Sequence, residues 1–183
     1  MRTPDDAIRI RDYVEAEKVK KAVVIGGGFI GLEVAENLLA QGVDVTVMDF
    51  ASQIMPNVLD PEMADYAQRH LRKQGVRVLT GTKAEKLVGD ARVTAVKTAS
   101  ATLPAELVVL SAGIRPNTAF LASSGIEMEK GAIVWIPAEN QSPRRICCRD
   151  CALVTNRITG RRQWSPMGSS ANLEGRTLAQ VLA

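Results

Sequence analysis

The fold of this chain is decided by the stretch Lys21-Ala22-Val23-Val24-Ile25-Gly26-Gly27-Gly28-Phe29-Ile30-Gly31. The run from Lys21 to Ile25 is short, apolar and rich in β-branched residues, as buried parallel strands are. The glycines that follow fit the pattern G-x-G-x-x-G between a strand and a helix, which is typical of dinucleotide-binding turns. Gly26 permits a tight turn, Gly28 lets the backbone approach a pyrophosphate, and Gly31 lets the helix pack closely against the strand.

A helix and an acid follow this turn, as dinucleotide binding requires. The helix from Ile30 to Ala40 has an apolar side, and the free N–H groups at its amino end attract phosphate. The next strand, Val43 to Asp49, closes on an acid that can accept hydrogen bonds from the adenosine ribose hydroxyls. Asp49 also repels a 2′-phosphate, and no Arg or Lys follows it in residues 50–53, so the sequence predicts NAD(H) rather than NADP(H). In an alternative interpretation, Asp49 only caps the turn after the strand.

The rest of the chain predicts an α/β fold. Helices are predicted at Asp5–Glu17 and Pro61–Gln74, strands at Val76–Leu79 and Leu107–Leu110, and short antiparallel strands from Thr82 to Lys97 that turn at Gly89-Asp90. This order predicts a Rossmann-type doubly wound parallel sheet with an inserted antiparallel β ribbon, and it makes residues 1–115 the NAD(H)-binding domain.

Residues 116–183 form a separate tail in this interpretation. They contain a short helix at Thr118–Ser123, an irregular stretch rich in Arg, Pro and Cys, and a final helix at Ser170–Leu182. The tail is too small and too broken for a core of its own. We therefore expect it to be poorly ordered in solution without a partner sheet.

Composition and charge exclude several classes of protein. With 46% apolar and 23% charged residues, the 183-residue chain is typical of a soluble globular protein. Its net charge of +3 is spread along the chain without a basic face, so no nucleic-acid partner is expected. The longest apolar run, Ala22 to Ile30, is too short to span a membrane, and the amino end carries no secretory signal. The sequence therefore predicts a cytoplasmic protein that acts on a small molecule.

Taken together, the motifs resemble one enzyme family. Residues 23–33 resemble the NAD-binding domain of the FAD-dependent pyridine nucleotide-disulfide oxidoreductases, nearest to the branch with CoA-disulfide reductase, NADH oxidase and NADH peroxidase. Residues 2–7 are similar to the family's crossing from its first FAD segment, and residues 111–117 to the crossing back. Residues 150–152, 164–168 and 171–176 resemble part of the second FAD segment, so that the resemblance covers nearly the whole chain.

The resemblance implies roles for further residues. Phe29 would be the aromatic lid that covers the flavin until nicotinamide displaces it, and Glu33 would lie near the nicotinamide and the flavin ring. Gly113 would let the backbone pass close to the cofactor, and Asp150 would match the ligand of the flavin ribitol. Alternatively, Phe29 packs against the sheet, Glu33 is a solvated acid near the helix dipole, and Gly113 ends a strand. The predicted cofactor-binding residues are Gly26, Gly28, Phe29, Ile30, Gly31, Glu33, Asp49, Ala112, Gly113 and Asp150.

The same resemblance implies a larger protein than this chain. The family's first FAD-binding segment, with its redox-active cysteine, would lie before Met1, and a dimerisation domain would follow Ala183. The complete protein would be a homodimer with FAD, and it would pass hydride from NADH to the flavin and on to a disulfide, a peroxide or oxygen. We expect no catalytic residue and no activity in this chain alone. The alternative is a non-catalytic NAD-binding module with a regulatory or interaction role.

Residues 134–149 interrupt the resemblance. The family pattern T-x-x-P-[DN]-[VI]-[YF]-A-x-G-D is lost from Trp135 to Arg149 and resumes at Asp150. Ile146-Cys147-Cys148-Arg149, read one base later, can encode Tyr-Ala-Ala-Gly, so we hypothesise that this stretch is out of frame, which the coding sequence tests. In the competing interpretation Cys148 and Cys151 form a C-x-x-C motif. One such pair without a nearby histidine gives too few ligands for zinc, so no metal site is predicted, and His70 is expected on a helix surface.

Overall fold

The structure is a computed structural model, and it describes residues 3–134 and 150–182. The chain divides into two compact units, Met1–Gly113 and Ile114–Ala183. The sequence places the corresponding domain boundary near Arg115. The out-of-frame hypothesis and the cysteines Cys147 and Cys148 lie outside the described residues, so both interpretations of that stretch stay predictions.

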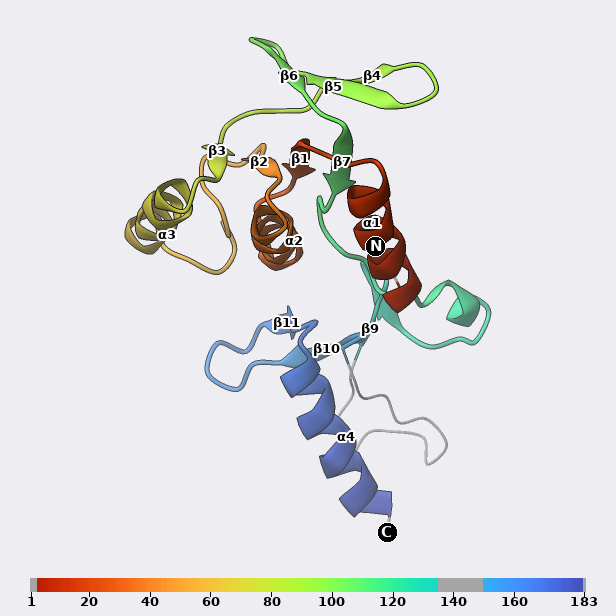
Figure 1. The fold of residues 1–183 in the computed structure, drawn as a ribbon. Coiled ribbons are helices and arrows are strands. Elements are labelled where there is room, and N and C mark those ends of the chain that lie inside the picture. The colour runs from red at the N-terminus through yellow and green to blue at the C-terminus, as the bar shows by residue number, and fades with distance from the viewer. Residues whose placement is uncertain (1–2, 135–149, 183) are drawn as a thin grey trace. The chain divides into compact units, whose positions relative to one another are not determined.

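Four parallel strands form the central sheet of the first unit (Figure 1). They are β1 (Lys21–Ile25), β2 (Asp44–Met48), β3 (Arg77–Leu79) and β7 (Leu107–Leu110), in the order β3-β2-β1-β7. Ile25 pairs with Met48 on one side and with Leu110 on the other, so the carboxyl ends of these three strands are level. The α/β class and its parallel sheet, as the sequence predicts them, are confirmed.

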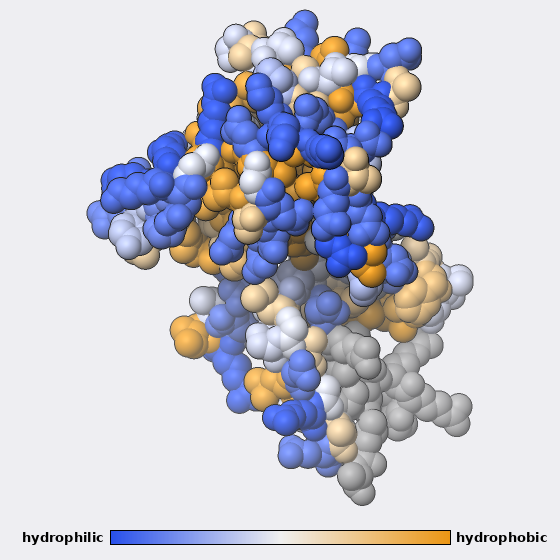
Figure 2. All heavy atoms as spheres, viewed as in Figure 1, coloured by the Kyte–Doolittle hydropathy of each residue, from blue (hydrophilic) through white to orange (hydrophobic). Residues whose placement is uncertain are grey.

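Three helices cover one face of this sheet: α1 (Pro4–Ala16), α2 (Phe29–Ala40) and α3 (Pro61–Lys73) (Figure 1). Strand alternation creates the core beneath them, because Val45 and Val47 point to this face and are fully buried in the larger hydrophobic cluster. The outer side of α3 carries charged residues and is hydrophilic in Figure 2. His70 lies exposed on this helix, as predicted.

The three helices end in the same way. Each is followed by a left-handed residue and then by a buried valine, namely Lys18-Val19, Gly42-Val43 and Gly75-Val76. The valine N–H donates to the carbonyl five residues earlier over 3.0 to 3.2 Å, as in the Schellman motif. Glycine favours the left-handed conformation, whereas Lys18 adopts it with a φ of 51° despite its side chain.

An antiparallel meander covers the opposite face of the sheet (Figure 1). Its strands are β4 (Lys86–Gly89), β5 (Val93–Lys97) and β6 (Thr102–Pro104), in that order. Val96 and Leu103 share a second hydrophobic cluster with Val23 and Met48 of the sheet. The sequence predicts the ribbon but ends it at Lys97, so β6 is a correction; it is short and ends in proline, which is atypical of strands. The ribbon is therefore a full layer of the core, and the helices cover one face only.

The second unit contains a small mixed sheet. Its described elements are a 3-10 helix at Ala119–Leu121, the strands β8 (Met128–Glu129), β9 (Ala132–Val134), β10 (Ala152–Thr155) and β11 (Arg162–Trp164), and the helix α4 (Gly168–Leu182). The strand order is β11-β10-β9-β8, and β9 and β10 are parallel. Ala132, Val134 and Leu153 form a small cluster against which Trp164 packs.

This sheet corrects the prediction of an irregular tail. Its strands have two to four residues, which is too short for an alternation pattern to be recognised in the sequence. The 3-10 helix and α4 lie where the sequence places helices. The disorder expected for this tail in solution stays a prediction.

Neither a membrane-spanning helix nor a metal cluster occurs in the described parts of the chain. Within residues 3–134 and 150–182, no helix is both long and apolar enough to cross a membrane. The same residues contain no group of three or more His, Cys, Asp or Glu side chains placed to hold a metal ion. The Cys151 thiol lies 3.6 Å from a carboxylate oxygen of Asp150.

An exposed ion pair joins the end of α1 to the meander. The Arg92 guanidinium donates to both carboxylate oxygens of Glu17. This hydrogen-bonded contact, together with the positive charge of Arg92, holds the pKa of Glu17 below its ordinary value. A carboxyl with a lowered pKa stabilises the fold above its unfolded pKa, and this contribution is lost as the pH falls through the folded pKa.

We predict that Arg92→Ala raises the pKa of Glu17 towards its ordinary value, because the hydrogen bonds and the opposing charge are both removed. When the pH is lowered from above the unfolded pKa of Glu17 to below its folded pKa, the free energy of unfolding of the variant should fall less than that of the wild type. A carbon-detected NMR titration of the Glu17 carboxyl measures the shift. Lys97→Ala removes a positive charge from β5 and should leave the Glu17 pKa unchanged, and an equal rise in both variants would speak against the pairing.

Candidate functional site

The glycine turn between β1 and α2 is a backbone bend without room for side chains. Gly26 has a φ of 115°, and a Cβ added to it would lie 2.4 Å from the backbone carbonyl oxygen of Ser111, directly after β7. A Cβ added to Gly31 would lie 1.9 Å from the Gly26 carbonyl oxygen, because α2 starts directly against the turn. These contacts are the physical reason for glycine at both positions.

Gly28 differs from these two glycines because the space in front of it is open. Its backbone is extended, with a φ of −85°, and a Cβ added there would meet no atom within 4 Å. The packing of this unit therefore does not require glycine at this position. An open space in front of a bare backbone is what a ligand that approaches the backbone closely needs.

The amino end of α2 has no side-chain cap. The Thr3 side chain caps α1 and the Asp60 side chain caps α3. The N-cap residue of α2 is Gly28, which has no side chain and so makes no capping hydrogen bond. The first four N–H groups of a helix have no partner within it, and the helix dipole adds partial positive charge there. This end of α2 is therefore suited to bind a phosphate.

The Asp49 carboxylate lies beside the turn, directly after β2. One oxygen accepts a hydrogen bond from the Gly27 N–H at 2.6 Å, and the other accepts one from the Ala51 N–H at 2.8 Å. Each carboxylate oxygen keeps a further lone pair with which it can accept a ribose hydroxyl. The two interpretations of Asp49, as a ribose acceptor and as a turn cap, are therefore compatible.

The sequence does not predict the residues that contact the turn on its protein side. The fully buried Ile54 places its Cγ2 2.9 Å from the position of a Cβ on Gly27. The Met55 N–H donates to the Gly27 carbonyl over 3.0 Å. The Ser111 hydroxyl lies 3.1 Å from the carbonyl oxygen of Ile25. The only sequence signal is the run of three glycines, because Ile, Met and Ser are ordinary residues that lie far from the turn along the chain.

The other predicted site residues of the first unit lie around this turn. Phe29 is 50% exposed on the first turn of α2, so it does not pack into the core, and Ile30 and Glu33 are exposed on the same helix. Ala112 and Gly113 follow β7 at the same edge of the sheet and are exposed. Asp150 lies in the second unit, where its backbone carbonyl accepts a hydrogen bond from the Trp164 indole.

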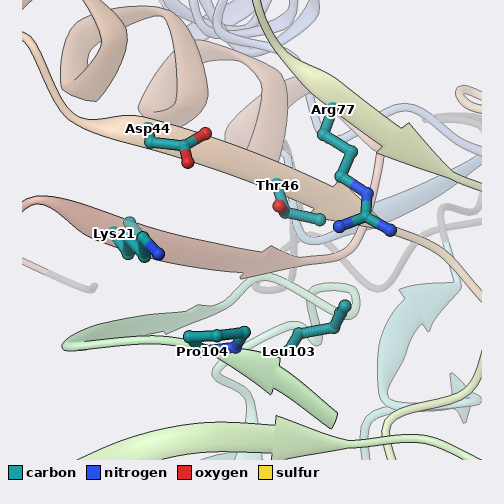
Figure 3. Close-up of a pocket in the computed structure, with 7 residues that line it drawn as sticks. Lys21, Asp44, Thr46, Arg77, Leu103 and Pro104 are labelled. Atoms are coloured by element: carbon teal, nitrogen blue, oxygen red, sulfur yellow. The ribbon is translucent and has the colours of Figure 1, made fainter. Parts of the chain in front are cut away.

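A small cavity at the other end of the sheet has a different character (Figure 3). It has a volume of about 120 Å³, and its walls are Lys21, Ala22, Asp44, Thr46, Arg77, Leu103 and Pro104. Lys21, Asp44 and Arg77 each begin their strand, so the cavity lies at the amino ends of the strands, beside β6. Ligands of parallel α/β sheets bind outside the carboxyl ends, so this cavity is not the dinucleotide site.

A level parallel sheet, a glycine turn and an acid after the second strand define a Rossmann domain of the dinucleotide-binding class. The chain belongs to the pyridine nucleotide-disulphide oxidoreductase family, whose profile matches residues 1–138. An NADH oxidase of Methanocaldococcus jannaschii is 35% identical over 184 residues, which cover 100% of this chain and 41% of that protein. The family predicted from the sequence is thus confirmed.

Solved structures agree with this membership. The NAD-dependent persulfide reductase of A. fulgidus superposes with a TM-score of 0.90 and 33% identity, over 99% of this chain and 34% of that one. The water-forming NADH oxidase from Lactobacillus brevis, bound to NADH, has a TM-score of 0.81 and 29% identity, over 94% and 39%. Its engineered NADPH oxidase form, bound to NADPH, gives 0.80 and 27%, over 93% and 38%. The chain spans about two fifths of the length of the curated relatives it matches.

We predict opposite effects of one added methyl group at two glycines of the turn. Gly26→Ala forces a side chain into a φ of 115° and against the Ser111 carbonyl, so the free energy of unfolding should fall by about 2 kcal/mol. Gly28→Ala meets no protein atom, so its unfolding free energy should stay within about 0.5 kcal/mol of the wild type. Urea unfolding measures both values. A Gly26→Ala protein as stable as the wild type would contradict the close approach to Ser111.

Proposed function

We propose that this chain is the NAD(H)-binding portion of a flavin-dependent oxidoreductase that passes hydride from NADH to FAD and on to a disulfide, a peroxide or oxygen. The proposal rests on the open space in front of Gly28 at the uncapped end of α2, and on the Asp49 carboxylate that binds the neighbouring Gly27 N–H. This arrangement fits a dinucleotide, with its phosphates against backbone N–H groups and its ribose hydroxyls against the carboxylate. Relatives named as an NADH oxidase and an NAD-dependent persulfide reductase support it.

The preference for NAD(H) rests on Asp49 in this proposal. The engineered NADPH oxidase carries five substitutions: Gly to Ala, Asp to Ala, Ala to Arg, Met to Ser and Pro to Arg. Their spacing along the chain is that of Gly31, Asp49, Phe50, Ala51 and Pro56 here, and the glycine, the aspartate and the proline are shared. The substitutions remove an acid and add two cations, which favours a 2′-phosphate. Phe50 is 76% exposed, so a ligand has access to this position.

The residues around the turn supply position and electrostatics. NADH would supply the hydride and the flavin would accept it, so the cofactors carry the redox chemistry. In the proposal, Phe29 would cover the flavin when no nicotinamide is bound, and Glu33 would lie near the nicotinamide and the flavin ring. The family resemblance assigns Gly113 a close approach to the flavin, and it assigns Asp150, in the second unit, the role of a ligand of the flavin ribitol. A homodimeric, cytoplasmic complete protein is part of the same proposal.

Gly28→Ala tests the site itself, because its methyl group would occupy the space assigned to the pyrophosphate. We predict a loss of NADH affinity of about tenfold or more, with the stability of the fold retained. Titration of NADH fluorescence measures the affinity. Gly175→Ala, which adds a methyl group in open space on α4, is the matched control and should bind NADH like the wild type. A wild-type chain that does not bind NADH at millimolar concentration would refute the proposal.

Asp49→Ala combined with Phe50→Arg tests the cofactor preference. We predict that the double variant binds NADPH more tightly than NADH, with the ratio of the two dissociation constants changed by about a hundredfold, because an acid is lost and a cation gained beside the 2′-position. Calorimetry with each cofactor measures the ratio. Asp44→Ala removes an acid from the other end of β2 and should leave the ratio unchanged. An unchanged ratio in the double variant would show that Asp49 does not face the ribose.

A further inference from the structure

One loop holds the middle glycine of the turn from two sides. The Gly27 N–H donates to the Asp49 carboxylate at 2.6 Å, and the Gly27 carbonyl accepts from the Met55 N–H at 3.0 Å. Both partners belong to residues 49–55, directly after β2. Both backbone polar groups of Gly27 are therefore fixed by a single segment.

That loop is itself anchored to the sheet. The Asp49 N–H donates to the Leu79 carbonyl at 2.9 Å, and the Asp49 carbonyl accepts from the Thr82 N–H at 2.8 Å. The Ala51 carbonyl accepts from the Gly81 N–H at 2.7 Å. The carboxylate that meets Gly27 thus extends from a backbone with little freedom to move.

The far end of the loop is held under strain. Met55 has a φ of 50°, which residues other than glycine, asparagine and aspartate rarely adopt. Met55 is only 9% exposed, and the preceding Ile54 is fully buried against Gly27. Strained backbone persists where the surrounding structure determines it, and here the surroundings aim the Met55 N–H at the turn.

We infer that Asp49 is a positioning residue for the pyrophosphate-binding turn, in addition to the ribose contact of the proposed function on which this inference rests. Its charge-assisted hydrogen bond draws the Gly27 N–H into the protein. The neighbouring N–H groups at the amino end of α2 stay oriented towards the open space before any ligand arrives. A site ordered in advance does not lose affinity to ordering when the ligand binds.

The positioning role of Asp49 and its electrostatic repulsion of a diphosphate predict opposite changes in affinity when the carboxylate is removed. A carboxylate near a pyrophosphate repels it, so its removal alone should tighten the binding of a ligand that lacks ribose hydroxyls. If Asp49 orders the turn, its removal should weaken that same ligand. A ligand with the diphosphate but without the hydroxyls therefore reports the positioning role alone.

The experiment compares ADP with 2′,3′-dideoxy-ADP on the wild type and on Asp49→Asn by calorimetry. An amide cannot accept from both N–H groups, because its NH₂ group faces one of them. We expect Asp49→Asn to bind the dideoxy ligand about tenfold more weakly than the wild type does. Asp44→Asn makes the same change of charge at the other end of β2 and should bind both ligands like the wild type.

Each outcome decides one claim. Dideoxy-ADP binding to Asp49→Asn that is equal or tighter overturns the positioning role while leaving the ribose contact in place. A wild type that binds neither ligand refutes the proposed function instead.

A second measurement needs no ligand and no variant. In the free wild type, the Gly27 amide proton should exchange slowly with solvent and resonate at low field, because it donates to a carboxylate. Exchange of this proton as fast as that of an unstructured amide would overturn the inference, even if Asp49→Asn failed to fold. Where Asp49→Asn folds, with the amides of β1 and β7 unshifted, the Gly27 amide proton should move to higher field, because it no longer donates to a carboxylate.

Discussion

The glycine turn lies so close to the end of β7 that no side chain fits between them, and the first unit depends on this contact. The Gly26 N–H donates to the Met48 carbonyl at 2.8 Å, and the Ser111 N–H donates to the Ile25 carbonyl at 2.8 Å. The chain therefore stays paired on both sides until it bends away from the sheet. Because α2 then starts against the Gly26 carbonyl, the position of the helix and of its free N–H groups follows from this one close approach.

The two ends of the parallel sheet differ in the residues that they expose, and the candidate site lies at the carboxyl end. Charged residues begin the strands at the amino edge, where Lys21, Asp44 and Arg77 line a small polar cavity. Large apolar side chains are exposed at the carboxyl edge, where Phe50 is 76% and Leu110 69% exposed. Apolar surface of this kind in a folded unit commonly marks the place where a ligand or another segment binds.

The sequence predicts the part of the site that depends on local chemistry. The run before Gly26, the spacing of the glycines and the acid after β2 can each be recognised without knowledge of the fold, because each follows from a requirement of the backbone or the ligand. The residues that fix the turn could not be predicted in this way. Ser111 and Met55 act through backbone groups and a hydroxyl brought to the turn by the fold, and the short strands β6 and β8 to β11 have too few residues for a recognisable period.

The left-handed residue and buried valine that follow each helix fix which face of the next strand points to the core. Side chains two residues apart in a strand point to the same face of the sheet. After α2, Val43 therefore points to the same face as Val45 and Val47, and after α3, Val76 points to the same face as Val78. All five valines belong to the cluster beneath the helices. Inserting or deleting one residue at either joint would turn the strand over and bring its polar side chains into the core. A change of length should be tolerated better where the chain is exposed and contributes nothing to the core, as at residues 56–58. The two joints thus fix the number of residues between each helix and the strand that follows it, whereas the carboxyl edge of the sheet carries no such constraint on length at its exposed positions.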